Sequence, residues 1–130
     1  MSEELHDRIR NVIETEPVAV FIKGTPRQVM CGNSERALDA LRSVGAPITA
    51  VDVLPDPEIR RELSAISSWP TIPQVFVRGE LVGGADIVEE LAQTGQLRAT
   101  LDEKLGDGYE AGEEKVVAVS DRPSPFRVVP

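Results

Sequence analysis

The chain of 130 residues contains one cysteine, Cys31, and its surroundings favour chemistry at the thiol. An apolar run at 18–22 leads into a loop with glycine and proline, and the apolar spacing becomes helical directly after Cys31. Backbone N–H groups and the dipole at the start of a helix stabilise a thiolate. Cys31 is therefore a candidate reactive thiolate or metal ligand. The alternative is a small buried hydrophobic residue, which fits poorly in a loop of turn residues.

Other residues could bind a ligand near this thiol. Lys23 adds positive charge in the preceding loop, and the guanidinium of Arg60 suits a carboxylate. Each is also compatible with an ordinary solvated cation. The glycine pair 83–84, followed by Ala85 and Asp86, opens a predicted helix whose N–H groups could receive a carboxylate. A glycine pair taken alone is weak evidence for such a site.

Residues 69–73 read Trp-Pro-Thr-Ile-Pro, and the two prolines interrupt any regular element. A cis peptide before Pro73 would expose the backbone of Ile72 to a ligand, whereas an ordinary trans turn is the alternative. Histidine, aspartate and cysteine do not cluster in the sequence, and His6 stands alone on a terminal helix. The chain by itself therefore offers no metal site of the usual protein-only kind.

Hydrophobic patterning predicts the elements that position these residues. Strands are expected where apolar residues are continuous or alternate, at 18–22, 48–53, 74–77 and 81–83. Helices are expected where apolar residues recur with helical spacing, before Pro17, at about 33–44, after an Asp56 cap, after an Asp86 cap, and over 97–105.

The order of these elements predicts how the strands pair. The strands 18–22 and 48–53 are linked through a helix, so they should be parallel, and 74–77 should join 18–22 antiparallel. The predicted fold is α/β, with a four-stranded mixed sheet flanked by helices. Cys31 then lies just beyond the carboxyl end of a parallel strand, where sites gather in such sheets.

Composition limits the classes of function. The net charge of −8 argues against a general nucleic-acid-binding surface. No apolar run approaches the ~18 residues of a membrane span, and the acidic start of the chain lacks a signal-peptide pattern. A lone cysteine cannot form an internal disulfide, which points to a reducing compartment. We therefore expect a cytoplasmic protein that binds neither nucleic acid nor membranes.

The composition changes near the end of the chain. We expect a folded domain at 1–105 and an acidic, flexible tail at 106–130, where glycine, acidic residues and then proline are frequent. Within this tail, residues 116–119 are apolar and could add a short edge strand.

Four blocks of the sequence together resemble the monothiol glutaredoxins that carry a Cys-Gly-Phe-Ser site. The blocks are Lys23-Gly24-Thr25-Pro26, Cys31-Gly32-Asn33-Ser34, Trp69-Pro70-Thr71-Ile72-Pro73-Gln74 and Gly83-Gly84-Ala85-Asp86-Ile87. The resemblance spans about residues 5–105, and the order and spacing of the blocks make it specific. It implies a thioredoxin fold, glutathione binding and a 2Fe–2S cluster bridged between two protomers.

The same resemblance assigns roles to individual residues. Cys31 would be the catalytic thiol and the iron ligand. Lys23 and Arg60 would hold the glycyl carboxylate of glutathione, and Ile72 would offer its backbone to the glutathione cysteine. Ala85 and Asp86 would take the γ-glutamyl end. The implied partners are glutathione, a second copy of the chain, apo iron–sulfur proteins and a BolA-like protein.

The sequence departs from the family pattern beside the thiol. Asn33 replaces the usual aromatic residue, which removes an apolar shield, and Met30 precedes the cysteine. Ala85 stands where many relatives have a cysteine, which should preserve the backbone contacts. We expect Asn33 to affect the lifetime of a cluster more than the fold. The resemblance also makes Pro73 the cis proline.

Three functional interpretations remain open from the sequence. The first is a carrier or sensor of a 2Fe–2S cluster, and the second is a glutathione-dependent oxidoreductase that removes glutathione from mixed disulfides. The third is a redox-inert interaction module. Ser34 in place of a second cysteine excludes an internal disulfide cycle, but removing glutathione needs only one protein thiol. The long loop before Cys31 resembles the cluster-handling class, whereas Asn33 leaves the oxidoreductase open.

Overall fold

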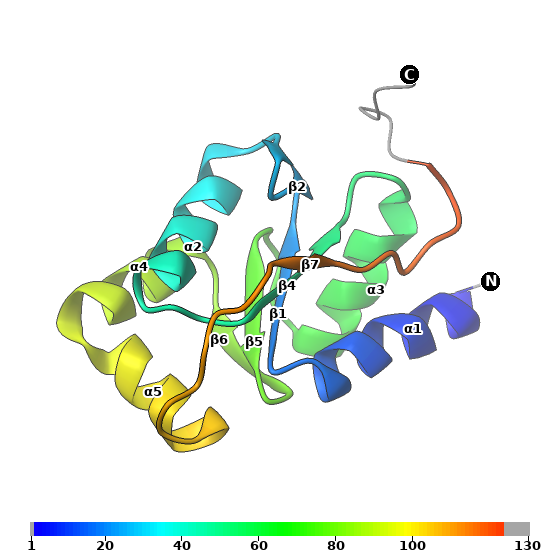
Figure 1. Ribbon diagram of the computed structural model, residues 1–130. Helices are drawn as coiled ribbons and strands as arrows, with labels where there is room; N and C mark the ends of the chain where they lie inside the picture. The colour runs from blue at the N-terminus through cyan, green and yellow to red at the C-terminus, as the bar shows by residue number, and fades with distance from the viewer. Residues whose placement is uncertain (1, 124–130) are drawn as a thin grey trace.

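The computed structural model describes residues 2–123 and is built on a mixed β-sheet with helices on both faces (Figure 1). The sheet has the order β6-β5-β1-β4-β7, and its strands are β1 (Val18–Ile22), β4 (Ile48–Asp52), β5 (Gln74–Val77), β6 (Glu80–Gly83) and β7 (Lys115–Val116). A separate small hairpin is formed by β2 (Gly24–Thr25) and β3 (Gln28–Val29).

The central strand β1 has the neighbours that the sequence predicts. It pairs in parallel with β4, with Val18 opposite Ile48, and antiparallel with β5, with Val18 opposite Val77. Strands β5 and β6 form an antiparallel hairpin. All five residues of β1 are buried, as is typical of a strand covered on both faces. Both predicted pairings of β1 are confirmed.

Helices cover the two faces of the sheet in two groups. They are α1 (Ser2–Thr15), α2 (Gly32–Ser43), α3 (Pro57–Ser67), α4 (Ala85–Thr94) and α5 (Gln96–Leu105). Helices α1 and α3 pack on one face with Phe21, and α2, α4 and α5 pack on the other with Val20. Successive strand residues point to opposite faces, so β1 contributes to both cores. Each large side chain buried in this way contributes about 1.5–3 kcal/mol. Within residues 2–123, no helix combines the length and apolarity needed to cross a membrane.

The N-cap predicted for α3 is found in the structure, whereas the one predicted for α4 is not. Asp56 caps α3 as predicted, because its Oδ1 accepts a hydrogen bond from the N–H of Glu58 at 3.0 Å. Asp86 was expected to cap α4, and this expectation is wrong: the N-cap is Gly84. The carbonyl of Gly84 already accepts the first helical hydrogen bond, from Val88 at 3.1 Å. Asp86 therefore lies in the first helical turn, where the helix dipole still favours a carboxylate.

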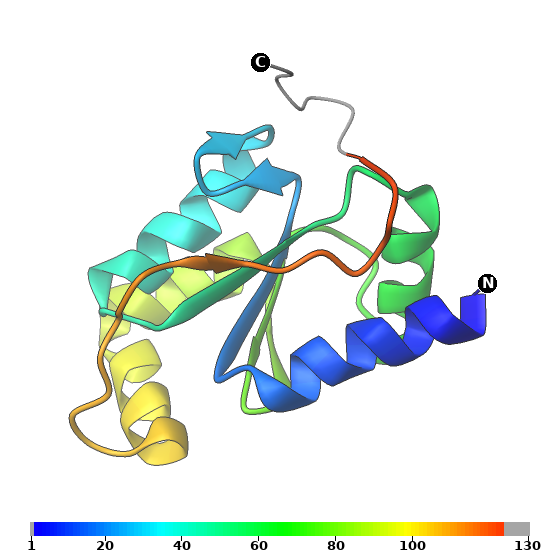
Figure 2. The same cartoon turned by 45° about the vertical axis from the view of Figure 1, so that its right-hand side comes forward.

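The segment after α5 returns across the molecule and adds a fifth, edge strand, which covers Lys115–Val116 rather than the expected 116–119. Strand β7 pairs in parallel with β4, and Figure 2 shows this segment, in orange, running alongside β4. Before β7, the hydroxyl of Tyr109 donates to the carbonyl of Val44 at 2.7 Å, and after it Val119 is buried at 2% exposure. The division at 105/106 stays a prediction, and residues 124–130 of the expected tail lie outside the described residues.

Candidate functional site

Cys31 is the N-cap residue of α2, and its side chain is partly exposed. Its backbone is extended, and the hairpin β2–β3 leads into it. The N–H of Met30 donates to the carbonyl of Lys23 at 2.9 Å, which closes the base of this hairpin. The loop that the sequence left without regular structure is thus an ordered turn that delivers the thiol to the start of a helix.

Ser34 fixes the start of α2 against the end of β1. It is fully buried, and its hydroxyl accepts a hydrogen bond from the N–H of Lys23 at 3.1 Å. This positioning role of Ser34 was not predicted from the sequence. A serine in the first turn of a helix commonly bonds to nearby backbone, which was the available signal. That signal does not identify the hydrogen-bond partner of Ser34, Lys23, which lies eleven residues earlier in the chain.

The surroundings of Cys31 lower the pKa of its thiol. Partial burial alone raises this pKa, but the net shift is below the ordinary value. The lowering comes from hydrogen bonds of the thiolate with the backbone N–H groups of Ser34 and Asn33, then from the Ser34 hydroxyl, and then from the charge of Lys23. This direction confirms the prediction that a helix start and Lys23 favour the thiolate.

A groove of 430 Å³ is lined by Asn33, which follows Cys31 by two residues, and by Ile72, Pro73, Ala85 and Asp86, among others. Cys31 itself is not one of the residues that line it. The peptide bond between Ile72 and Pro73 is cis, as the resemblance implied. The structure therefore brings together three of the residues predicted to contact glutathione, namely Ile72, Ala85 and Asp86. A Cβ atom on Gly84 would lie 3.3 Å from the carbonyl oxygen of Pro73. Glycine at this position therefore permits the close approach of Pro73 to the start of α4.

The other two predicted ligand residues, Lys23 and Arg60, are not among the residues that line this groove. Lys23 is close enough to Cys31 for its charge to act on the thiol. Arg60 is exposed near the start of α3, which follows β4 at the same end of the sheet as Cys31 (Figure 1). Arg60 forms no ion pair within the described part of the chain. Its contact with a carboxylate stays a prediction.

Asp52 supports the loop that carries Lys23, a role that was not predicted from the sequence. Its Oδ1 accepts hydrogen bonds from the N–H groups of Gly24 and Leu54, both at 2.9 Å. Gly24 has a φ of +95°, and a Cβ atom there would lie 2.2 Å from the carbonyl oxygen of Gln28. The loop conformation therefore depends on glycine at position 24 and on the carboxylate at the end of β4.

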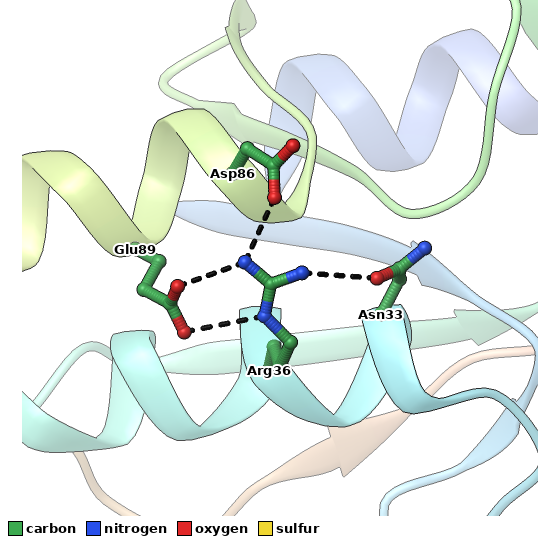
Figure 3. A network of polar contacts seen from close by, with 4 residues as sticks. All are labelled: Asn33, Arg36, Asp86 and Glu89. Carbon is green, nitrogen blue, oxygen red and sulfur yellow. Dashed lines mark hydrogen bonds and ion pairs between the residues drawn. The ribbon is translucent and has the colours of Figure 1, made fainter.

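Arg36 connects the thiol end of α2 with the first turns of α4 (Figure 3). Its guanidinium donates to Asn33 Oδ1 at 3.0 Å and to Asp86 Oδ1 at 2.8 Å. It also holds both carboxylate oxygens of Glu89, at 2.8 and 3.3 Å. Hydrogen bonds, first with Glu89 and then with Asp86, raise the pKa of Arg36, and the bond with Arg36 lowers the pKa of Glu89. Nothing in the sequence indicated that these residues meet.

Larger pockets exist elsewhere in the structure, but the predicted site residues do not line them. Two of them, of 770 and 610 Å³, lie between α1 and the C-terminal segment and include none of the predicted site residues. Across residues 2–123, no three side chains of His, Cys, Asp or Glu gather in a way that could hold a metal ion. The thiol and the groove that Asn33 lines are therefore the candidate site.

Comparison with known proteins gives the family. The glutaredoxin family model matches residues 18–82. Glutaredoxin 4 of Pasteurella multocida is 45% identical over 98 residues, which are 75% of this chain and 90% of that protein. A monothiol glutaredoxin ycf64-like protein of Synechocystis is 44% identical over 105 residues, covering 81% of this chain and 98% of that protein. Monothiol glutaredoxin-S11 of rice is 45% identical, but the chain spans only 21% of its length.

Solved structures give the same result for the fold. Reduced apo GrxS14 of poplar superposes with a TM-score of 0.70 at 34% identity, covering 78% of this chain and 93% of that one. A truncated 1-C-Grx1 of Trypanosoma brucei gives a TM-score of 0.70 at 41% identity, covering 76% of this chain and 90% of that one. The predicted thioredoxin fold is confirmed. With its single cysteine at the start of α2, the chain belongs to the monothiol glutaredoxin family.

Proposed function

We propose that this chain binds glutathione and carries a 2Fe–2S cluster between two copies of itself, for delivery to apo iron–sulfur proteins in the cytoplasm. A BolA-like protein is a further proposed partner. The observation that carries the proposal is a lone, partly exposed thiol at the start of α2, whose first turn lines a groove together with Ile72, Ala85 and Asp86.

The donor set of the chain is compatible with such a cargo. A 2Fe–2S cluster is held by four thiolates in its common form. The sequence has one cysteine, so two copies supply two thiolates through Cys31 and two glutathione molecules supply the others. Cys31 fits this role because it is partly exposed and its pKa is lowered. Two of the four ligands are then small and exchangeable, which suits delivery better than permanent storage.

The groove offers complementary groups to glutathione. The N–H groups of Ala85 and Asp86 at the start of α4 suit the γ-glutamyl carboxylate. The backbone of Ile72 suits the cysteinyl unit, and Lys23 and Arg60 supply charge for the glycyl carboxylate. A buckwheat glutaredoxin solved as a glutathione complex superposes with a TM-score of 0.70. At 23% identity that likeness concerns the fold, so glutathione is proposed from the groove residues.

A second candidate function is a glutathione-dependent oxidoreductase that removes glutathione from mixed disulfides. The lowered pKa of Cys31 favours it. In this reaction the thiolate attacks the glutathione sulfur of a mixed disulfide, and the protein thiolate of the substrate leaves and takes up a proton. A second glutathione thiolate then attacks the Cys31–glutathione disulfide, which releases oxidised glutathione and restores the Cys31 thiolate. One protein thiol suffices for both steps.

Anaerobic reconstitution with iron and sulfide tests the carrier function. With glutathione present, the protein should become coloured and dimeric, because two chains alone supply only half of the ligands. Without glutathione, and in Cys31→Ser with glutathione, it should stay colourless and monomeric. If the wild type stays colourless under all anaerobic conditions and yet reduces glutathione mixed disulfides rapidly, the carrier proposal fails and the oxidoreductase replaces it.

A further inference from the structure

The network around Arg36 places a positive charge directly on a residue of the groove. Asp86 lines the groove, and its Oδ1 is bonded to Arg36 Nη2 at 2.8 Å. The same nitrogen lies 2.8 Å from Glu89 Oε1, on the next turn of α4. Arg36 itself does not line the groove, but it contacts two residues that do, Asp86 and Asn33 (Figure 3).

This pairing changes how Asp86 presents its charge. An unpaired carboxylate at the mouth of a groove attracts a ligand ammonium group. Here one oxygen is already occupied by a guanidinium, so an ammonium placed on the other oxygen would lie close to a second positive charge. Glu89 compensates part of that charge, and the three side chains together carry a net charge of about −1 at neutral pH. Recognition of an ammonium is therefore weakened but not abolished.

Arg36 also sets the orientation of Asn33. A guanidinium has only N–H donors, so the side-chain atom of Asn33 that faces it must be the amide oxygen. The bond from Arg36 Nη1 to Asn33 Oδ1 is 3.0 Å, and the Asn33 amide nitrogen points away from Arg36 (Figure 3). Asn33 is a residue of the groove lining, so its N–H donor favours acceptor groups of a ligand, such as a carboxylate or an amide carbonyl.

We propose that Arg36 is a positioning residue that sets ligand specificity, shifting the α4 end of the groove from ammonium recognition toward carboxylate and carbonyl recognition. The substrate class is then wider than glutathione and includes small thiols that keep the carboxylate but have a blocked or missing α-ammonium group. This inference rests on the proposed function, because it concerns the same groove and the same ligand end.

The test compares two reduced thiols under anaerobic conditions by NMR titration. One is glutathione, and the other is its analogue with glutaryl in place of the γ-glutamyl group, which keeps the carboxylate and lacks the ammonium. The measured quantity is the ratio of the Kd of the analogue to the Kd of glutathione. This ratio cancels any loosening of the groove that weakens both ligands equally.

Two variants should move the ratio in opposite directions. Arg36→Gln removes the positive charge, so the ratio should rise about three- to tenfold over the wild type. Glu89→Gln leaves Arg36 without its compensating partner, so the ratio should fall below that of the wild type. Both changes should shrink at high salt, because the network is largely exposed.

The outcomes separate the inference from the function on which it rests. Glutathione binding with an unchanged ratio in both variants, or a shift of the same sign in both, would overturn the role of Arg36 and leave the proposed function in place. An equal loss of affinity for both thiols would make Arg36 only a tether between α2 and α4, and would also overturn it. Absence of glutathione binding in the wild type would remove the proposed function itself, and the inference with it.

Discussion

The hydroxyl of Ser34 accepts a hydrogen bond from the backbone N–H of Lys23 at 3.1 Å, and both residues also act on the thiol of Cys31. The residue that joins the first turn of α2 to the end of β1 is thus also a hydrogen-bonding partner of the thiolate. Ser34 therefore contributes both to the geometry at Cys31 and to the acidity of its thiol.

Replacing Ser34 with alanine should raise the pKa of Cys31 and lower the stability of the fold. The Lys23 N–H would lose its partner in a buried place, which costs about 1–3 kcal/mol. The measurements are thiol titration and urea unfolding. Ser43→Ala is the matched control in the same helix, because among residues 2–123 the Ser43 hydroxyl bonds only to the carbonyl of Ala40. An equal effect of both variants on the thiol titration would contradict the role of Ser34.

Lys23→Ala should move the pKa of Cys31 upward, since its positive charge is one of the groups that favour the thiolate. The rate of alkylation against pH gives this pKa directly. In the wild type the inflection should lie below that of a free cysteine. Arg27→Ala, which removes a cation from the same loop without a contribution to the Cys31 pKa, should leave the inflection in place.

Arg60→Ala should weaken glutathione binding several-fold through loss of a carboxylate contact, with a modest effect because the side chain is exposed. Arg61→Ala is the neighbouring control, since Arg61 is bonded to Glu58 within α3 at 2.6 Å. Isothermal titration of both variants checks this expectation. Equal affinities in the two variants would reject Arg60 as a ligand residue.

Asn33→Phe should lengthen the lifetime of a reconstituted cluster in air, because an aromatic ring limits solvent access to the sulfur ligands. The same change removes the bond between Asn33 and Arg36. Asn33→Ala separates these effects, since it removes the bond without adding a ring. The decay of visible absorbance in air should be slower than in the wild type only in the phenylalanine variant.

Stability should fall at acidic pH, in part through Glu16. Its pKa is lowered mainly by a hydrogen bond with Lys115 at 2.7 Å and then by one from Thr49 at 2.6 Å. Because the folded pKa lies below the unfolded one, this carboxylate stabilises the fold above the unfolded pKa of about 4.3. That stabilisation is lost as pH falls through the folded pKa.

Urea unfolding between neutral and acidic pH tests this prediction. Glu16→Gln should reduce stability at neutral pH and flatten the loss on acidification. Glu113→Gln is the control, because Glu113 is exposed and forms no ion pair with other described residues. If the stability of Glu16→Gln depends on pH in the same way as that of the wild type, the contribution of this carboxylate is rejected.

The sequence by itself determined the elements and the place of the thiol. The buried run at 18–22, the helical spacing after Cys31 and the Asp56 cap are local patterns, and each formed the element that it predicted. An element can bury an apolar face only if its apolar residues recur with the spacing of a helix or a strand. Residues close together in the sequence therefore indicate which element forms. The single cysteine at a strand-to-helix boundary was therefore enough to locate the candidate site.

Only the tertiary structure decided which side chains meet across these elements. Arg36 contacts Glu89 from 53 positions away, and the edge strand that the short apolar pattern allowed pairs with β4, a partner that the pattern did not indicate. The cap of α4 is Gly84 rather than Asp86, and a Cβ atom on Gly84 would lie 3.3 Å from the carbonyl oxygen of Pro73, a proximity that no local pattern records. Such contacts depend on how elements pack in space, and polar side chains on exposed helix faces have no sequence period that marks their partners.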